Sequence, residues 1–239
     1  NKKKCFVIAL ERPGYGISDP ISNFKITDWP KIVLEVVNIL KIKKFSIIGV
    51  SGGAPFALAC ANAIKSKKLK SIAIVCGLAP HNVKGMNKGR VGMLINYGKK
   101  PFISWMLLHL LRINLLKNNI EKNFNRWKNK IPLPEADLKL FTLNRGVRLM
   151  QNFKEAVKHG TTGIHRDANL YSKDWGFKLE NINKKIFIWH GDKDLTVPII
   201  TNKYYKKILK NKKIFIKSNE GHFSICYNFM NDIIRQVSE

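Results

Sequence analysis

One stretch of the sequence, residues 45–61, places a glycine-rich turn between an apolar run and an alanine-rich run. It reads FSIIGVSGGAPFALACA, with Ser51 at the apex of the turn. The apolar run is typical of a buried strand and the alanine-rich run of a helix. We expect Gly49 and Gly53 to be required, because a larger side chain would collide with the neighbouring backbone in so tight a turn. The stretch therefore predicts a strand, a sharp turn and a helix, with the serine hydroxyl lifted clear of the sheet.

A serine held in this way can act as a nucleophile, and the pattern G-x-S-x-G is that of a nucleophile elbow. The following helix begins beneath the hydroxyl, so the unpaired N–H of Gly52 points to where negative charge would develop on a substrate oxygen. Pro55 suits the first turn of this helix, where an N–H has no helical partner to lose. The pentapeptide can also be a plain turn, and a chance match in a chain of this length has odds of roughly one in ten.

The chain is strongly basic, with 43 Lys and Arg residues against 16 Asp and Glu and a formal net charge of +27. This charge raises a nucleic-acid partner or an anionic membrane as possibilities. Most of the basic residues are lysines spread over the whole length, and arginine-rich stripes with interleaved aromatic residues are absent. We therefore expect no nucleic-acid partner. The sequence does not indicate an oligomeric state.

The four cysteines, Cys5, Cys60, Cys76 and Cys226, occur singly and without metal-ligand spacing. Three of them lie in apolar patterns, so we expect small buried side chains and no metal or other cofactor. A reducing, cytoplasmic compartment follows as the default. The sequence starts at Asn1 and not at Met, so the lack of a visible signal peptide carries little weight.

Apolar runs and helical patterns alternate along both ends of the chain. The runs expected to form buried strands are residues 5–10, 45–50, 71–77, 185–191 and 213–217. Such alternation implies right-handed βαβ units and a mostly parallel sheet, that is, an α/β fold. Between residues 81 and 183 the strand pattern stops and helical patterns dominate. The expected organisation is a core of residues 1–80 and 184–239, with a helical cap, residues 81–183, inserted after the third strand of this chain.

Residues 101–116, PFISWMLLHLLRINLL, are apolar nearly all round. The run is too short to span a bilayer. We expect a cap helix with Trp105, Met106 or Leu110 facing an apolar substrate pocket. Docking on a membrane surface is the alternative, disfavoured because the run lacks a clean polar face. A membrane partner is therefore not expected.

Two further residues can complete a site around Ser51. Acyl transfer by a serine needs a base and an acid that orients the base. Asp194 and His222 both follow predicted parallel strands, so they lie at the same carboxyl edge of the sheet as Ser51. Their order, Ser, Asp and then His, is the one expected for this type of elbow. Each alone could merely cap a helix, and Asp192 is a rival for the acid.

Several segments together resemble the α/β-hydrolase superfamily, in particular its capped ester hydrolases: ERPGYGISDP, GVSGGAPFALACA, WHGDKDLTVP and NEGH. The resemblance covers nearly the whole chain. It implies that Ser51 is the nucleophile, that His222 is the base and that the N–H of Gly52 is one oxyanion donor. The family pattern places the acid three residues after Gly191, which implies Asp194.

The resemblance also implies that the chain is incomplete at its N-terminus. Family members have strands upstream of the one that corresponds to residues 5–10, and the loop after the third provides a second oxyanion donor. We therefore expect a sheet of the α/β-hydrolase type that lacks its first strands. Residues 5–10 and 45–50 would then lie roughly 10 Å apart, without direct hydrogen bonds. The alternative is that residues 5–10 pair directly with the elbow strand.

The function implied is that of a serine hydrolase that cleaves carboxylic esters, or related acyl bonds, of small apolar substrates through an acyl-enzyme at Ser51. The fold does not choose between esters, thioesters, lactones, amides and C–C bonds. A non-catalytic ligand-binding or signalling protein on the same fold is the alternative.

Overall fold

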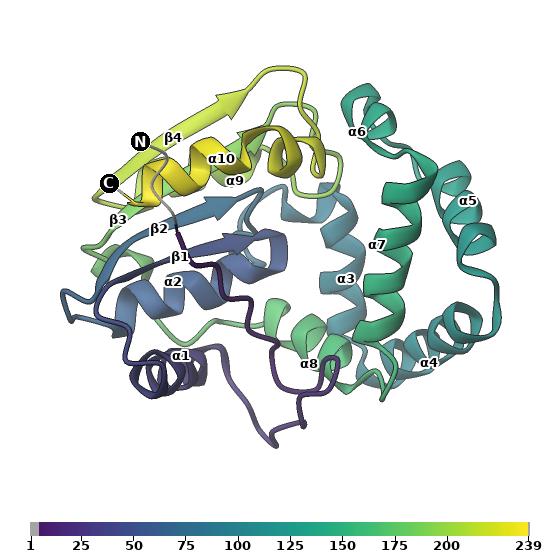
Figure 1. Cartoon of the computed structure of the whole chain (residues 1–239), viewed down its shortest axis with the longest axis horizontal. Coiled ribbons are helices and arrows are strands. Elements are labelled where there is room, and N and C mark those ends of the chain that lie inside the picture. The colour runs from purple at the N-terminus through teal and green to yellow at the C-terminus, as the bar shows by residue number, and fades with distance from the viewer. Residues whose placement is uncertain (1–4, 239) are drawn as a thin grey trace.

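A four-stranded parallel sheet forms the centre of the structure, a computed structural model that describes residues 5–238. Its strands lie side by side in chain order, β1-β2-β3-β4 (Figure 1). Their bounds are Phe45–Val50 for β1, Leu69–Val75 for β2, Lys185–Gly191 for β3 and Lys212–Lys217 for β4. The predicted α/β class with a parallel sheet is confirmed.

Helices cover both faces of this sheet, which explains why its central strands are almost continuously apolar. In β2 the side chains alternate between two clusters of buried residues. Ile72 and Ile74 belong to the cluster formed with α1 (Trp29–Ile39), α2 (Ala54–Ala63) and α9 (Ile200–Ile208). Ala73 and Val75 belong to the cluster formed with α10 (Ser224–Ser238) on the other face. The strand period of two thus divides one apolar run between two layers of helices.

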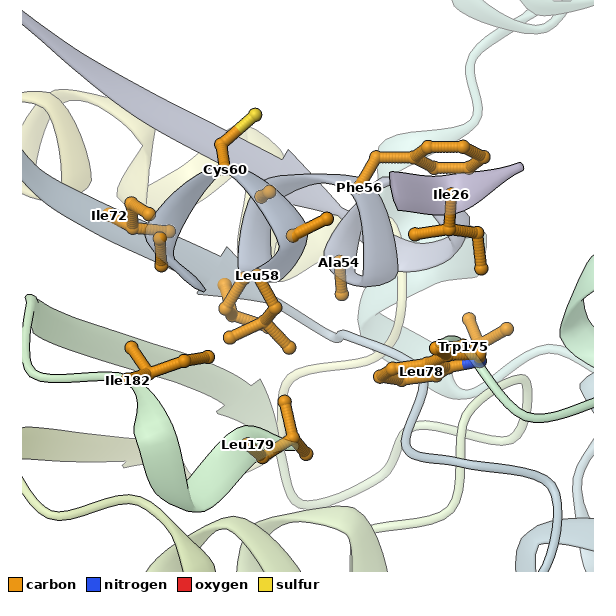
Figure 2. Packing of buried hydrophobic residues seen from close by; sticks show 14 of the residues in the cluster. Ile26, Ala54, Phe56, Leu58, Cys60, Ile72, Leu78, Trp175, Leu179 and Ile182 are labelled. Carbon is orange, nitrogen blue, oxygen red and sulfur yellow. The ribbon is translucent and has the colours of Figure 1, made fainter. Parts of the chain in front are cut away.

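Helix α2 is buried on nearly all sides, because its small alanine side chains let neighbouring elements approach closely. Residues 54–61 are all buried. Figure 2 shows Leu58 of this helix pointing toward Leu179 and Ile182, which precede β3. The helix that follows the serine turn is therefore anchored in the centre of the larger cluster.

Six helices lie between β2 and β3 in the chain. Their bounds are Arg90–Gly98 for α3, Pro101–Lys117 for α4, Ile120–Lys130 for α5, Glu135–Leu140 for α6, Leu143–Ala156 for α7 and Thr162–Tyr171 for α8. Four short 3-10 helices complete the described structure: η1 (Ile26–Asp28), η2 (Ser51–Gly53), η3 (Met86–Lys88) and η4 (Leu179–Asn181). The six helices gather at one end of the sheet (Figure 1).

The prediction of a buried strand at residues 5–10 is wrong. These residues form no strand, and Phe6 and Val7 are 88% and 72% exposed. Among the described residues β1 pairs only with β2, so no ladder joins residues 5–10 to the elbow strand. An apolar run becomes a strand only when a neighbouring strand pairs its backbone groups. The helical insertion consequently follows the second strand of the sheet and not the third.

Candidate active site

Ser51 lies at the sharp junction between β1 and the helix that follows it. Its φ is 51°, in the left-handed region, as the elbow pattern predicts. A non-glycine residue in this region stores backbone strain of roughly 1–3 kcal/mol. Residues 51–53 form the single turn η2, and α2 begins directly after it. The strained turn therefore places the serine at the carboxyl edge of the sheet.

Two of the glycines around Ser51 are required by close packing: Gly49, as expected, and Gly52. A Cβ at Gly49 would lie 2.8 Å from the carbonyl oxygen of Gly53 and 2.7 Å from the Cβ of Ala57. A Cβ at Gly52 would lie 2.6 Å from the hydroxyl oxygen of Tyr171. The predicted collision at Gly53 is wrong, because a Cβ there would have no heavy atom within 4 Å.

Substitution of Gly49 by alanine is expected to destabilise the protein by about 1–3 kcal/mol, since the turn must open to admit a methyl group. Gly53→Ala is the matched control. Gly53 has ordinary helical angles and open space around it, so alanine should be neutral or slightly stabilising there. Urea denaturation of both variants measures the difference. Equal midpoints for the two variants would show that the crossing of strand and helix at Gly49 tolerates a side chain.

The imidazole of His222 connects Ser51 to Asp194. His222 Nδ1 lies 2.7 Å from Asp194 Oδ2, and His222 Nε2 lies 3.1 Å from Ser51 Oγ. An ionised carboxylate can only accept, so Nδ1 carries the proton and Nε2 is free to accept the hydrogen bond of the serine hydroxyl. The three side chains thus form a continuous chain of hydrogen bonds. Its donors and acceptors are arranged in the direction that general-base catalysis requires.

Backbone groups of its own loop hold Asp194 in place. The N–H groups of Thr196 and Val197 donate to Asp194 Oδ1 over 2.7 and 2.9 Å. Burial by itself raises the pKa of this carboxyl. The hydrogen bond and the charge of His222, with a smaller contribution from His190, outweigh burial, so the pKa of Asp194 lies below its usual value. The acid is therefore ionised and oriented toward His222.

The rival carboxylate, Asp192, is hydrogen-bonded to a different partner and not to His222. It is half-buried and accepts a hydrogen bond of 2.7 Å from the backbone N–H of Asn219. This bond ties the turn after β3 to the turn after β4. Of the two candidates, only Asp194 lies within hydrogen-bond distance of His222 among the interactions of the described chain.

A residue that sequence reasoning missed, Asp137 of α6, holds the loop that carries His222. Its Oδ2 accepts from the N–H of His222 over 3.1 Å, and its Oδ1 accepts from the N–H groups of Phe223 and Ser224 over 3.1 and 2.8 Å. Asp137 is only 1% exposed. The carboxylate caps the start of α10, where backbone N–H groups have no helical partner. No motif marks Asp137, because its partners lie 85 or more positions away.

A second carboxylate of the insertion, Asp167 of α8, contacts the other side of the elbow. It accepts hydrogen bonds from Arg12 over 2.7 Å and from Tyr15 over 2.9 Å, both in the glycine-rich loop near the N-terminus. The hydroxyl of Tyr171, one turn further along α8, donates to the carbonyl oxygen of Gly52 over 2.8 Å. Helix α8 is therefore fastened to the turn directly after Ser51.

The remaining predicted site residues are not part of this hydrogen-bonded chain. Gly52 directly follows Ser51 in η2, and its role as oxyanion donor stays a prediction. Trp105, Met106 and Leu110 are 49%, 43% and 57% exposed on α4. The principal neighbours of α4 are α3, α7 and α8 and not the edge of the sheet (Figure 1). That these three line a pocket over Ser51 also stays a prediction.

The thiol of Cys76 lies beside the acid and the base. Three potential metal-ligand atoms, one each from Cys76, Asp194 and His222, lie within 4.8 Å of one another. All three residues are buried. Burial, followed by the charge of Asp194, raises the pKa of the thiol well above its usual value. A metal binds the thiolate and not the thiol. The arrangement thus suits a protonated Cys76 next to Asp194 better than a metal ligand.

Comparisons with known proteins bear on the fold of this chain. A family model described as the alpha/beta hydrolase fold matches residues 1–97. Among solved structures, a bromoperoxidase from Bacillus anthracis has a TM-score of 0.69 at 14% identity, over 95% of this chain and 79% of that one. An esterase from Exiguobacterium antarcticum has a TM-score of 0.64 at 17% identity, with the same coverage. No curated protein matched the sequence. These similarities establish the fold.

Proposed function

Because this chain is an α/β-hydrolase by fold, we propose that it is a serine hydrolase that cleaves carboxylic esters through an acyl-enzyme at Ser51. The observation that carries the proposal is the continuous hydrogen-bonded chain from Asp194 through His222 to Ser51. A strained φ at Ser51 supports it, since strain of this kind is maintained where a side chain must be aimed. The same fold hosts several chemistries, so the proposed activity is inferred from the triad and not from the fold.

In the first half of the reaction, His222 Nε2 takes the proton of the Ser51 hydroxyl as Oγ attacks the ester carbonyl carbon. The N–H of Gly52 is proposed to stabilise the negative oxygen of the tetrahedral intermediate. The C–O bond to the alcohol then breaks, and His222 returns its proton to the leaving oxygen. Asp194 stabilises the imidazolium that exists between these two transfers.

In the second half, water attacks the acyl group on Ser51, and His222 takes the proton of the water. The second tetrahedral intermediate collapses, and the proton returns to Ser51 Oγ as the carboxylic acid leaves. Every step uses residues of this chain and water, so the proposed reaction needs no added cofactor.

Labelling with a fluorophosphonate tests this proposal. A folded, active triad should give one covalent adduct on the peptide that contains Ser51, and Ser51→Ala should abolish the adduct. Ser46→Ala is a suitable control, because Ser46 lies on the same strand and hydrogen-bonds to the carbonyl of Val237. Unmodified Ser51 in a folded sample would contradict the proposal and favour a non-catalytic ligand-binding protein.

A further inference from the structure

Helix α4 is the most unusual surface of the molecule, because it presents large apolar side chains to solvent over its whole length. Of its 17 residues, all of them described, Ser104 alone is buried. Eight large apolar residues are at least 38% exposed: Phe102, Ile103, Trp105, Met106, Leu107, Leu110, Leu111 and Ile113. Contiguous exposed apolar surface of this kind marks an interaction site.

Four of these residues, including the two most exposed, share one side of the helix. Phe102, Met106, Leu110 and Ile113 follow spacings of four, four and three, which place side chains one above another along a helix. A different side of the helix is attached to the protein, since Arg112 donates to the carbonyl oxygens of Val157 and Lys158 over 2.7 and 2.6 Å. The helix is therefore fixed with its apolar stripe outward.

The charge around α4 selects the kind of partner. No Asp or Glu occurs between Glu35 and Glu121, so neither α3 nor α4 contains an acidic residue. Lys99, Lys100 and Lys117 lie exposed at the two ends of α4. A second copy of a chain with a net charge of +27 would be repelled, whereas an anionic surface would be attracted.

The acidic groups of the adjoining helices do not offset this charge. Glu155 of α7 lies 3.4 Å from Lys158. Asp167 of α8 is paired with both Arg12 and Arg166. The three lysines at the ends of α4 outnumber Glu121, the acidic residue at the start of α5, so the net charge at the ends of the apolar stripe is positive.

We propose that α4 is the docking surface of this protein for an anionic lipid membrane. The apolar stripe enters the boundary between headgroups and acyl chains, and the lysines at the ends of the helix contact anionic headgroups. No helix among the described residues is long and apolar enough to cross a bilayer. This assignment replaces the pocket-lining role expected for Trp105, Met106 and Leu110, and it reverses the expectation of no membrane partner.

Co-sedimentation with vesicles tests the docking surface. The chain is expected to bind vesicles of equal parts phosphatidylglycerol and phosphatidylcholine, and to bind pure phosphatidylcholine at least tenfold more weakly. Phe102→Asp combined with Leu110→Asp should reduce binding to the anionic vesicles roughly tenfold or more, because both charges would enter the apolar layer. Ile17→Asp combined with Ile39→Asp is the matched control, since these residues are 87% and 77% exposed elsewhere on the molecule.

The proposal is overturned if the chain does not bind anionic vesicles, if it binds neutral vesicles equally well, or if the control double variant loses as much binding. A dimer in vesicle-free solution that Phe102→Asp with Leu110→Asp dissolves would assign the surface to a second copy instead. Circular dichroism confirms that each variant is folded. Ser51→Ala should bind vesicles as the unaltered chain does, so the outcome is independent of the proposed hydrolase activity.

Discussion

Replacing His222 with alanine is expected to lower the turnover of an ester substrate by roughly four to six orders of magnitude, since the members of a triad act as a unit. His222 is the only group among the described residues that hydrogen-bonds to the hydroxyl of Ser51. Without it the hydroxyl proton has no acceptor when Oγ attacks. Steady-state hydrolysis of a chromogenic acyl ester, with the enzyme concentration taken from the absorbance of the folded protein, measures the loss.

Matched variants separate the loss of the base from general damage. His159 is exposed, and His159→Ala should leave turnover unchanged. Asp194→Asn should lower turnover by about four orders of magnitude, as removal of the orienting acid does in such triads, whereas Asp192→Asn should have a small effect. Near-normal turnover in His222→Ala, or a larger loss in Asp192→Asn than in Asp194→Asn, would show that the roles are wrongly assigned.

The sequence predicts best what is determined by neighbours in the chain. The turn at Ser51 is local, so its glycines, its proline and the alanine-rich helix together predict the left-handed φ that the structure contains. Alternating strands and helices likewise predict the parallel sheet, and parallel strands bring the ends that carry Ser51, Asp194 and His222 to one edge. The positions of the three triad residues can thus be predicted from the order of strands and helices, without any knowledge of side-chain packing.

Prediction fails where a residue depends on a distant partner. Residues 5–10 have the composition of a buried strand, but composition cannot provide the neighbouring strand that would pair them. The glycines that follow Ser51 also depend on distant partners that the sequence does not reveal. Gly52 is required because Tyr171 of α8 lies against it, whereas Gly53, whose spacing in the motif looks equally strict, faces open space.

The exposure of helix α4 is hard to predict from the sequence for a related reason. A run that is apolar nearly all round suggests burial, yet only Ser104 of that helix is buried. Which side of a helix finds a partner depends on how neighbouring helices cross it, and periodicity cannot decide this when every side is apolar.

Asp137→Ala is expected to lower kcat roughly tenfold to a hundredfold with little change in KM, because it frees the loop that positions the base. Three backbone N–H groups, those of residues 222–224, would lose their acceptor. Each buried donor left unpaired costs about 1–3 kcal/mol, so the loop should rearrange to reach water. Such a shift moves His222 relative to Ser51, and catalysis is sensitive to displacements of about 1 Å.

Two further variants distinguish positioning from loss of folding. Asp137→Asn retains one oxygen that can accept from Phe223 and Ser224, but it turns an N–H group toward the N–H of His222, so its effect should be intermediate. Glu135→Gln in the same helix should leave activity unchanged, because Glu135 is exposed and pairs only with Lys139 among its described contacts. The rate of fluorophosphonate labelling, measured on samples shown to be folded, reports on the contact between His222 and Ser51 directly. If folded Asp137→Ala were labelled as fast as the unaltered chain, Asp137 would not be needed to position His222. The contact of α6 with this loop would then contribute to the stability of the fold and not to catalysis.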